Sequence, residues 1–286
     1  MAGSSIGSFQ ILGTLGTGAH SSILHIRRST DSVQYALKVV DIKTKEEMKY
    51  LEQARHEFHI AQMLHHENLI KIFALETKRD WLFRVRKVHL LIEYVNGKTL
   101  DVIPRLSLSR LVQIFAKMSS ALMHMHRRGV YHADIKPNNV LLSRSGDVKI
   151  IDYGLSWIRG QQKGRLQGTP EYMAPEQARR GTVNEQTDIY NFGATMYRLV
   201  TFRLPPSTST NSGSKTLDAQ TFENNLKPVA ECMPQAPRAL CDLIHHCLAY
   251  EPKHRIERMG DVTEILDKLV GKLVKNPEDK LEAMEW

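Results

Sequence analysis

The segment Tyr131–Leu142, with the sequence YHADIKPNNVLL, decides how the rest of the chain is interpreted. Its spaced polar residues are His132, Asp134, Lys136 and Asn139. Pro137 disfavours a plain helix here, so the segment is expected to form a loop that can aim several polar groups at one point. A carboxylate there can take a proton from a hydroxyl, an ammonium can neutralise a moving phosphoryl group, and an amide oxygen can bind Mg²⁺. On this segment alone, a polar turn followed by a buried strand over Val140–Leu142 is the alternative.

Length and composition set the class of protein. The chain has 286 residues, enough for a sizeable core and near the size at which one core divides into two. Its composition, 42% hydrophobic and 24% charged, is ordinary for a protein in water. No segment approaches the roughly 20 apolar residues that span a bilayer, and the start, MAGSSIGSF, lacks the regions of a signal peptide. We therefore expect a cytoplasmic protein without a membrane span.

The chain is basic, with a formal charge of +8 and a pI near 9.3, which permits an acidic partner. The basic residues within Lys78–Lys87 alternate with Trp81, Phe83 and Val85. This alternation predicts a half-exposed strand more simply than a nucleic-acid-binding arm, so no nucleic-acid partner is expected.

The cysteines are Cys232, Cys241 and Cys247, an odd number without the spacing of a metal site. Buried free thiols are therefore predicted. The histidines, including the pairs His65–His66 and His245–His246, show no ligand pattern either.

The first part of the chain is rich in strands. Between Phe9 and Arg27, two β-rich runs flank a predicted turn with Gly16, Gly18 and Ser21. Glycines let a backbone approach a phosphate closely and offer it bare N–H groups. An ordinary hairpin turn is the alternative.

Lys38 lies within the next predicted strand, Gln34–Val40, among apolar residues where an unpaired ammonium would be costly. Thr44 and Glu47 have capping-box spacing and predict the start of a helix. Glu57 lies beside the apolar stripe of that helix, which comprises Met48, Leu51, Phe58, Ala61 and Leu64. A partly buried Lys38–Glu57 pair is expected; the alternative is a surface pair worth under about 1 kcal/mol.

Further strands are predicted at Leu69–Ala74 and Val88–Tyr94, after which Asn96–Gly97 turns the chain out of the first lobe. Apolar spacing then predicts a helix over Leu108–Arg127 that stops at Gly129 with a left-handed cap.

A short strand, Asp147–Ile151, is expected to pair with Leu141–Leu142. It leads into Asp152–Gly154, where the aspartate is placed to bind a second face of a metal ion. Gly168–Glu176, with two prolines, predicts an ordered loop.

The last part of the chain is predicted to be helical over Asp188–Val200, Ala239–Tyr250 and Val262–Leu273. Pro205–Lys215 is expected to be a flexible surface loop by composition. The charged end, Asn276–Trp286, is expected to fray.

Taken together, these segments resemble the protein kinase family from Phe9 to about Leu273. Gly16-x-Gly18-x-x-Ser21-x-Ile23 is similar to the glycine-rich loop, with serine in place of the third glycine. The other matching residues are the strand lysine Lys38, its helix partner Glu57, the catalytic-loop residues Asp134, Lys136 and Asn139, the metal-binding segment Asp152-Tyr153-Gly154 with tyrosine in place of phenylalanine, the segment Ala174-Pro175-Glu176, the buried helix aspartate Asp188, and Arg255, which pairs with Glu176.

The resemblance implies an α+β, two-lobed kinase fold. Residues 1–95 would form a small β-rich N-lobe with one main helix, 96–275 a larger, mostly helical C-lobe, and 276–286 a tail. It also implies ATP and Mg²⁺ as cofactors, with Mn²⁺ as a substitute.

The resemblance further implies roles for these residues. Asp134 would deprotonate the substrate hydroxyl, Lys38 and Lys136 would offset phosphoryl charge, and Asn139 and Asp152 would hold the metal. Residues expected to contact the nucleotide are Leu15, Gly16, Gly18, Ile23, Ala36, Lys38 and Leu141, the backbone of Glu93 and Val95, and Ile92 at the rear of the pocket.

Lys136 and Thr169 are similar to the serine/threonine-specific branch, and the region around them resembles the bacterial, eukaryotic-like (Hanks-type) kinases. The transmembrane and extracellular parts of many such kinases are not expected here. The implied partner is a protein with an acceptor Ser or Thr; the oligomeric state is left open. Ser207–Thr210 and Ser212–Thr216 are plausible autophosphorylation sites on exposure grounds only.

One position departs from the pattern. Kinases switched by activation-loop phosphorylation usually carry arginine between the catalytic histidine and aspartate, whereas this chain has Ala133. Trp157–Gly168 also contains no Ser, Thr or Tyr; the nearest hydroxyls are those of Ser156 and Thr169. Both observations predict an enzyme independent of phosphorylation within that segment.

Two other functions are weighed against an active protein kinase. A pseudokinase scaffold is hinted at by Ser21 and Tyr153, but Lys38, Asp134 and Asp152 are all present. A small-molecule kinase would share the His-x-Asp pattern but is not expected to carry Lys136 or the sequence GTPEYMAPE.

Overall fold

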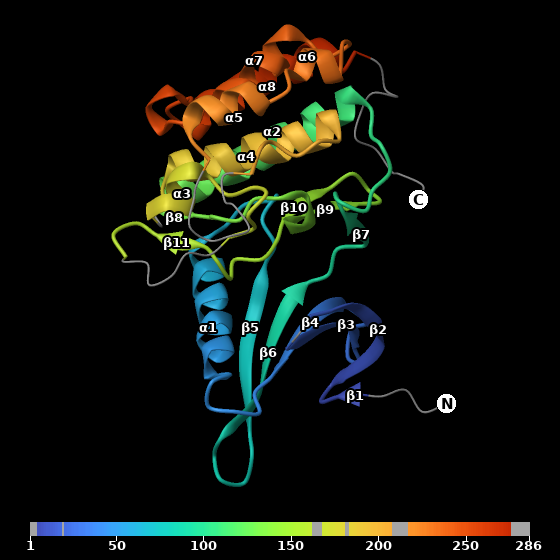
Figure 1. Ribbon diagram of the computed structural model, residues 1–286. Coiled ribbons are helices and arrows are strands. Elements are labelled where there is room, and N and C mark those ends of the chain that lie inside the picture. Colours follow the sequence, from blue (N-terminus) through green and yellow to red (C-terminus); the bar gives the residue numbers. More distant parts are fainter. Residues whose placement is uncertain (1–4, 19, 162–167, 181–182, 208–216, 276–286) are drawn as a thin grey trace. The chain divides into compact units, whose positions relative to one another are not determined.

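The computed structural model describes residues 5–18, 20–161, 168–180, 183–207 and 217–275 (Figure 1). The predicted loop at Pro205–Lys215 lies mostly outside these residues, as does the predicted frayed end, Asn276–Trp286. The chain forms two compact units. The first comprises Met1–His65, Leu69–Asn96 and Asp152–Gly154, and the second His66–Asn68, Gly97–Ile151 and Leu155–Trp286.

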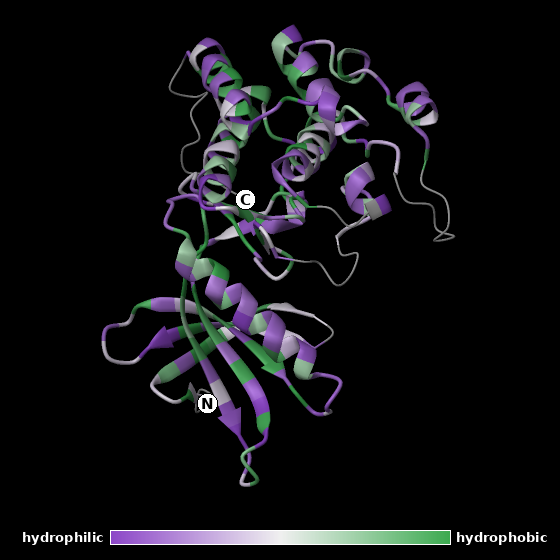
Figure 2. Ribbon diagram, turned by 90° about the vertical axis from the view of Figure 1, so that its left-hand side faces the viewer, coloured by the Kyte–Doolittle hydropathy of each residue, from purple (hydrophilic) through white to green (hydrophobic). Residues whose placement is uncertain are grey.

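The first unit is built on a six-stranded antiparallel sheet with the order β1-β2-β3-β4-β6-β5. Its elements are β1 (Ser5–Ile6), β2 (Phe9–Thr17), β3 (Ser21–Arg28), β4 (Gln34–Asp41), α1 (Met48–Met63), β5 (Ile72–Arg79) and β6 (Val85–Glu93). A small core of Ile26, Tyr35, Leu37 and Val39 packs on β3 and β4. Figure 2 shows α1 as a mostly polar helix, and it buries only Leu51, Ala54, Glu57 and Ile60.

The segment Lys78–Lys87 is a hairpin rather than the single half-exposed strand that its alternation predicts. β5 ends at Arg79, and β6 begins at Val85 after a turn. Trp81 and Phe83 lie in the turn and are 85% and 80% exposed. The aromatic side chains of this turn all face solvent, so they do not alternate between two faces as the side chains of a strand do.

The glycine turn and the start of α1 also differ in detail from the prediction. Gly16 lies in β2 and Ser21 opens β3, so the turn is shorter than the glycine motif. α1 begins at Met48, with Glu47 as its N-cap. The Glu47 carboxylate accepts the backbone N–H groups of Lys43 (2.6 Å) and Thr44 (3.2 Å), which stabilises the preceding turn instead of a helix starting at Thr44.

The second unit is mainly helical. Its helices are α2 (Leu108–Arg127), α3 (Pro175–Arg180), α4 (Glu185–Thr201), α5 (Ala219–Asn225), α6 (Val229–Cys232), α7 (Arg238–Cys247) and α8 (Met259–Leu273). α2 has its predicted bounds, and Gly129 has the left-handed φ of 70° expected after it. α5 and α6 are short and were not predicted, and α3 begins at Pro175, inside the predicted loop.

Two small sheets complete the second unit. One has the order β10-β9-β7 and the other pairs β11 with β8; the strands are β7 (Gly97–Thr99), β8 (Val130–Tyr131), β9 (Val140–Ser143), β10 (Val148–Ile150) and β11 (Trp157–Ile158). The predicted pairing is confirmed, because Val148 lies opposite Leu142 and Lys149 opposite Leu141. A Cβ at Gly97 would lie 2.2 Å from the carbonyl oxygen of Leu142, so only glycine allows this approach.

The three cysteines are free thiols, as predicted. Cys241 and Cys247 are buried, whereas Cys232 is half-buried.

Candidate active site

The predicted pair of Lys38 and Glu57 is present in the first unit. Lys38 Nζ on β4 lies 2.7 Å from Glu57 Oε2 on α1, and the Glu57 side chain is only 4% exposed. Burial alone would lower the pKa of Lys38, but the charges of Glu57 and Asp152 outweigh it and raise the pKa above its usual value. The ammonium is therefore held charged beside the Glu57 carboxylate.

Asp152 belongs to the same unit and has a left-handed φ of 68°. Its Oδ1 accepts the Gly154 N–H at 3.0 Å, which fixes the carboxylate within a tight turn. Tyr153 is completely buried, and its hydroxyl donates to the carbonyl of Ile70 at 2.9 Å. The tyrosine therefore replaces phenylalanine without leaving a polar group unsatisfied.

Residues predicted to contact the nucleotide lie on adjacent strands of the first unit. Gly16 on β2 is opposite Ile23 on β3, and Ala36 on β4 is opposite Ile92 on β6. Leu15 is 49% exposed, while Ala36 is buried. Val95, beyond the end of β6, has a backbone N–H with no hydrogen-bond partner among the described residues. The remaining predicted contact, Leu141, lies on β9 of the second unit.

The polar residues of Tyr131–Leu142 form one hydrogen-bonded group in the second unit. Asp134 Oδ2 accepts Lys136 Nζ at 2.7 Å and Asn139 Nδ2 at 3.1 Å. Asp134 Oδ1 accepts both the N–H (3.0 Å) and the hydroxyl (2.8 Å) of Thr169, whose oxygen also accepts Lys136 Nζ at 2.6 Å. This arrangement fixes one carboxylate by a cation, an amide and a hydroxyl, and the buried strand of the alternative interpretation follows it as β9.

Asp188 fixes the backbone just before this carboxylate. It is completely buried on α4 and accepts the N–H groups of His132 (2.8 Å) and Ala133 (2.7 Å) and the ring of His126 (2.8 Å). Ala133 has a left-handed φ of 66°, a conformation that costs free energy in a non-glycine residue and here is held by these hydrogen bonds. The prediction of a buried aspartate at this position is confirmed.

His126, Gln177 and Asn191 are not among the residues that the sequence predicts for this region. Gln177 Nε2 donates to the carbonyl of Ala133 at 2.9 Å, and Asn191 Nδ2 donates to the carbonyl of Tyr172 at 2.7 Å. All three are buried. For His126 and Asn191 the signal in the sequence was a polar residue inside an apolar helix pattern, but that pattern alone does not identify the partner.

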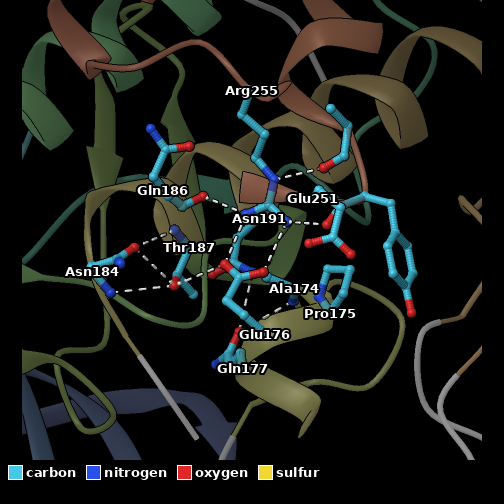
Figure 3. Close-up of polar contacts among 12 residues, drawn as sticks. Ala174, Pro175, Glu176, Gln177, Asn184, Gln186, Thr187, Asn191, Glu251 and Arg255 are labelled. Carbon is cyan, nitrogen blue, oxygen red and sulfur yellow. Dashed lines mark hydrogen bonds and ion pairs between the residues drawn. The ribbon is translucent and has the colours of Figure 1, made fainter. Parts of the chain in front are cut away.

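Arg255 and Glu176 form the predicted pair (Figure 3). Nη1 of Arg255 lies 2.8 Å from Oε1 of Glu176, and Nη2 lies 2.8 Å from Oε2. The arginine side chain is completely buried. Its other N–H groups donate to the carbonyls of Ala249, Tyr250 and Gln186, so all five donors have partners. The pair anchors the start of α3, and with it the segment that leads back to Thr169.

Oxygen donors suited to a hard cation are present in both units. Asn139 directs its amide nitrogen toward Asp134, and its Oδ1 receives no hydrogen bond from any residue that the structure describes. Oδ2 of Asp152 is likewise without a hydrogen bond from the described residues, while Oδ1 accepts one. Amide and carboxylate oxygens are ligands that Mg²⁺ prefers, so each of these two side chains is chemically suited to the ion.

Comparison with known proteins agrees with this geometry. Residues 9–268 match the protein kinase domain family. The chain is 29% identical over 209 residues to the probable serine/threonine-protein kinase SCO3848 of Streptomyces coelicolor, covering 70% of this chain and 31% of that protein. It is 27% identical over 271 residues to the serine/threonine-protein kinase PrkC of Bacillus subtilis, covering 90% of this chain and 39% of PrkC.

A plant relative is similar to the same degree. The chain is 30% identical over 210 residues to the CBL-interacting protein kinase 21 of Oryza sativa subsp. japonica, covering 70% of this chain and 39% of that protein. The chain therefore spans about a third to two fifths of the length of these relatives.

The fold and the two polar groups define a protein kinase domain with the α+β fold of that family. The chain belongs to the protein kinase family, with bacterial Hanks-type serine/threonine kinases among its relatives. The family uses ATP and a divalent metal. No helix in the described part of the chain is both long and apolar enough to cross a membrane.

Proposed function

We propose that this chain transfers the γ-phosphoryl group of ATP to serine or threonine hydroxyls of a protein. The observation that carries the proposal is the Asp134 carboxylate, held at once by Lys136, Asn139 and Thr169. A base for a substrate hydroxyl must be fixed within hydrogen-bond reach of the proton it accepts. Three side chains fix this carboxylate.

In the proposed mechanism Asp134 orients the acceptor hydroxyl and takes its proton. Lys136, paired with Asp134 at 2.7 Å, offsets the charge of the phosphoryl group as it moves. Asn139 and Asp152 would hold Mg²⁺, or Mn²⁺ in its place, which neutralises phosphate charge when bound. The chain thus supplies placement and charge rather than a covalent intermediate.

On the nucleotide side, Lys38 would contact the phosphates while Glu57 keeps its ammonium oriented. Gly16 and Gly18 would cover the phosphates, and Leu15, Ile23, Ala36 and Leu141 would enclose the adenine. The proposal places the carbonyl of Glu93 and the N–H of Val95 at the edge of the base. It requires these first-unit residues and the Asp134 group to meet at one nucleotide.

A pocket in the second unit supports a polypeptide as the acceptor. It has a volume of about 420 Å³ and is lined in part by Asn138, Thr169, Tyr172 and Phe202. Thr169 also contacts Asp134, so the pocket opens beside the proposed base. Side chains that flank an acceptor residue would lie here, whereas a small molecule would not need such a surface.

The test is transfer of labelled phosphate from ATP with Mg²⁺ to a generic basic protein. Asp134→Asn should lower transfer by about 10²–10⁴-fold. Nucleotide binding and the circular dichroism spectrum of the folded protein should not change. If the chain is a pseudokinase, the unmodified protein will bind nucleotide but transfer no phosphate. A small-molecule kinase would label an aminoglycoside in preference to protein.

We also propose that activity does not depend on phosphorylation within 157–168. Ala133 takes the place of a phosphate-binding arginine, and its carbonyl is held by Gln177 at 2.9 Å instead. Peptide mapping of active protein by mass spectrometry should find this segment unmodified, and phosphatase treatment should leave the rate unchanged. Activity that rises with phosphate on this segment and disappears after phosphatase treatment is the contrary result.

The proposed place of action is the cytoplasm, because the three cysteines are free and two are buried thiols.

A further inference from the structure

The hairpin between β5 and β6 carries an exposed apolar tip that plays no part in the proposed function. Figure 1 shows this hairpin projecting past the other loops at its end of the sheet. Trp81, Leu82 and Phe83 follow one another at its turn and are 85%, 44% and 80% exposed. Three consecutive large apolar residues in water are costly unless something covers them.

The tip is held in one conformation by Asp80. Its Oδ1 accepts the N–H groups of Leu82 (2.9 Å) and Arg84 (3.0 Å), and its Oδ2 accepts Arg86 Nε at 2.8 Å. Desolvation alone would raise the pKa of Asp80, but the hydrogen bonds from the backbone and from Arg86 outweigh it and lower the pKa. The turn is therefore built to present its side chains outward.

Phe83 has a left-handed φ of 59°. Glycine usually occupies such a turn position, because a β-carbon there costs free energy. Here the chain places an aromatic ring at that position and exposes it. A conformational cost combined with an exposed ring points to a role for the ring outside the fold.

Basic side chains surround the three apolar residues. Within 78–87 there are five lysines and arginines and a single acidic residue, Asp80. Lys78, Arg79, Arg86 and Lys87 are each engaged with a neighbouring group. Arg84 has no side-chain partner in the described part of the chain. The charge next to the apolar tip is therefore positive.

We propose that this tip, Trp81–Phe83 with Arg84 beside it, inserts into the surface of an anionic lipid bilayer. Tryptophan and phenylalanine favour the membrane interface, and flanking arginines attract acidic headgroups. The tip is convex, which suits insertion between lipids. A single-stranded nucleic acid instead needs a groove that follows its backbone with successive stacking platforms, and a convex turn with leucine at its centre does not provide one.

The test is sedimentation of the full chain with vesicles of phosphatidylcholine alone or with a third of phosphatidylglycerol. Unmodified protein should bind the anionic vesicles at least tenfold more tightly, and less tightly as salt rises. Phe83→Gly and Trp81→Ser should each weaken this binding at least tenfold, and Arg84→Gln about fivefold. Phe83→Gly is the decisive variant, because glycine adopts the same φ without strain and the fold is kept.

Val33→Ser provides the matched control. Val33 is 43% exposed near another hairpin turn of the same unit, so its removal should leave vesicle binding unchanged. Millimolar glycerol phosphate should not displace the protein from vesicles, because a free phosphate offers nothing to the apolar side chains. Phosphoryl transfer in solution should be the same for Phe83→Gly and the unmodified chain.

Equal vesicle binding by the unmodified chain and Phe83→Gly overturns the proposal. Absence of binding to anionic vesicles does so as well. Binding of an oligo-dT strand that is lost in the same variants, without vesicle binding, would assign the tip to nucleic acid instead.

Discussion

Thr169 contacts both charged groups of the proposed catalytic loop through one hydroxyl. It donates to Asp134 at 2.8 Å and accepts from Lys136 at 2.6 Å. Thr169→Val removes the hydroxyl at nearly constant volume, so the carboxylate loses its position and kcat should fall on the order of tenfold to a hundredfold. Thr169→Ser keeps the hydroxyl and should retain most of the rate. Steady-state kinetics with a protein substrate measures both, and a loss in Thr169→Ser as large as that in Thr169→Val would show that the hydroxyl alone does not hold the carboxylate.

Tyr153 is a second residue whose hydroxyl can be tested alone. Tyr153→Phe restores the residue usual in the family but leaves the carbonyl of Ile70, now 2.9 Å from the hydroxyl, without its donor. The free energy of unfolding should fall by about 1–3 kcal/mol, since a buried acceptor is left unsatisfied. Urea unfolding followed by circular dichroism measures the change. An increase in stability would mean that the hydroxyl is merely tolerated.

For single residues, the sequence predicts ion pairs better than it predicts hydrogen bonds of hydroxyl groups. Lys38 and Glu57 could be matched because burying either charge alone is costly, which leaves few partners to choose from. The contact of Thr169 with Asp134 could not be predicted, because water or a backbone group satisfies the hydrogen bonds of a hydroxyl equally well. Its partner lies 35 residues away in sequence, and only the folded loop brings the two together.

The junction of α2 and α4 contains a buried histidine whose pKa is raised. His126, at the end of α2, contacts Asp188 (2.8 Å) and Glu185 (3.3 Å) of α4. Burial alone would lower the pKa of His126, but the hydrogen bonds to these carboxylates outweigh it and raise the pKa to about 9. A raised folded pKa means that the stabilisation is fully present below about pH 6.5 and is lost as the pH rises toward about 9.

Stability should therefore fall on the order of 3 kcal/mol between about pH 6.5 and pH 9 on account of this histidine. His126→Gln carries no titrating charge, so its stability should change much less over the same range. Burial lowers the pKa values of His66, His89 and His245, so these histidines titrate below the range. Parallel pH curves for the two proteins, from urea unfolding, would contradict the assignment.

The pair that anchors α3 should behave as a buried ion pair. Arg255→Met leaves Glu176 without its bidentate partner and should cost about 3–5 kcal/mol of unfolding free energy. Adding Glu176→Met should recover part of that loss, since an apolar pair avoids the unpaired carboxylate. Chemical denaturation of the single and double variants gives the coupling free energy. A double variant as unstable as the sum of the two single variants is the outcome that excludes coupling.

At the scale of elements, the long helix α2 was predicted more closely than the strands β5 and β6. α2 has its predicted bounds because a long apolar stripe, Ser107 as its N-cap and Gly129 after it all agree. β5 and β6 extend several residues beyond the predicted strands toward the hairpin turn. Their outer ends are polar and face solvent, so they carry no apolar pattern, and the turn lacks the glycine or asparagine that usually marks one.

For the whole molecule, the order of the motifs was sufficient to predict the fold class. A β-rich first part with one helix and a helical second part is what the structure shows in its two units. The assignment of Asp152–Gly154 to the first unit was not predicted, because these residues follow β10 of the second unit directly in sequence. Only long-range contacts such as that of Tyr153 with Ile70 determine it.

This division gives a test of whether one nucleotide is bound by both units. Lys38 belongs to the first unit and Asn139 to the second, and we propose that each contacts ATP or its metal ion. A ligand that binds only the folded state stabilises it by about 2.7 kcal/mol at 100 times its Kd. A non-hydrolysable ATP analogue with Mg²⁺ should therefore raise the thermal midpoint of the unmodified chain, and of Asp134→Asn almost equally. Lys38→Met and Asn139→Ala should each reduce the increase. If only Lys38→Met reduces the increase in the thermal midpoint, the nucleotide is bound by the first unit alone. The proposed transfer to a hydroxyl at Asp134 would then have no phosphoryl donor.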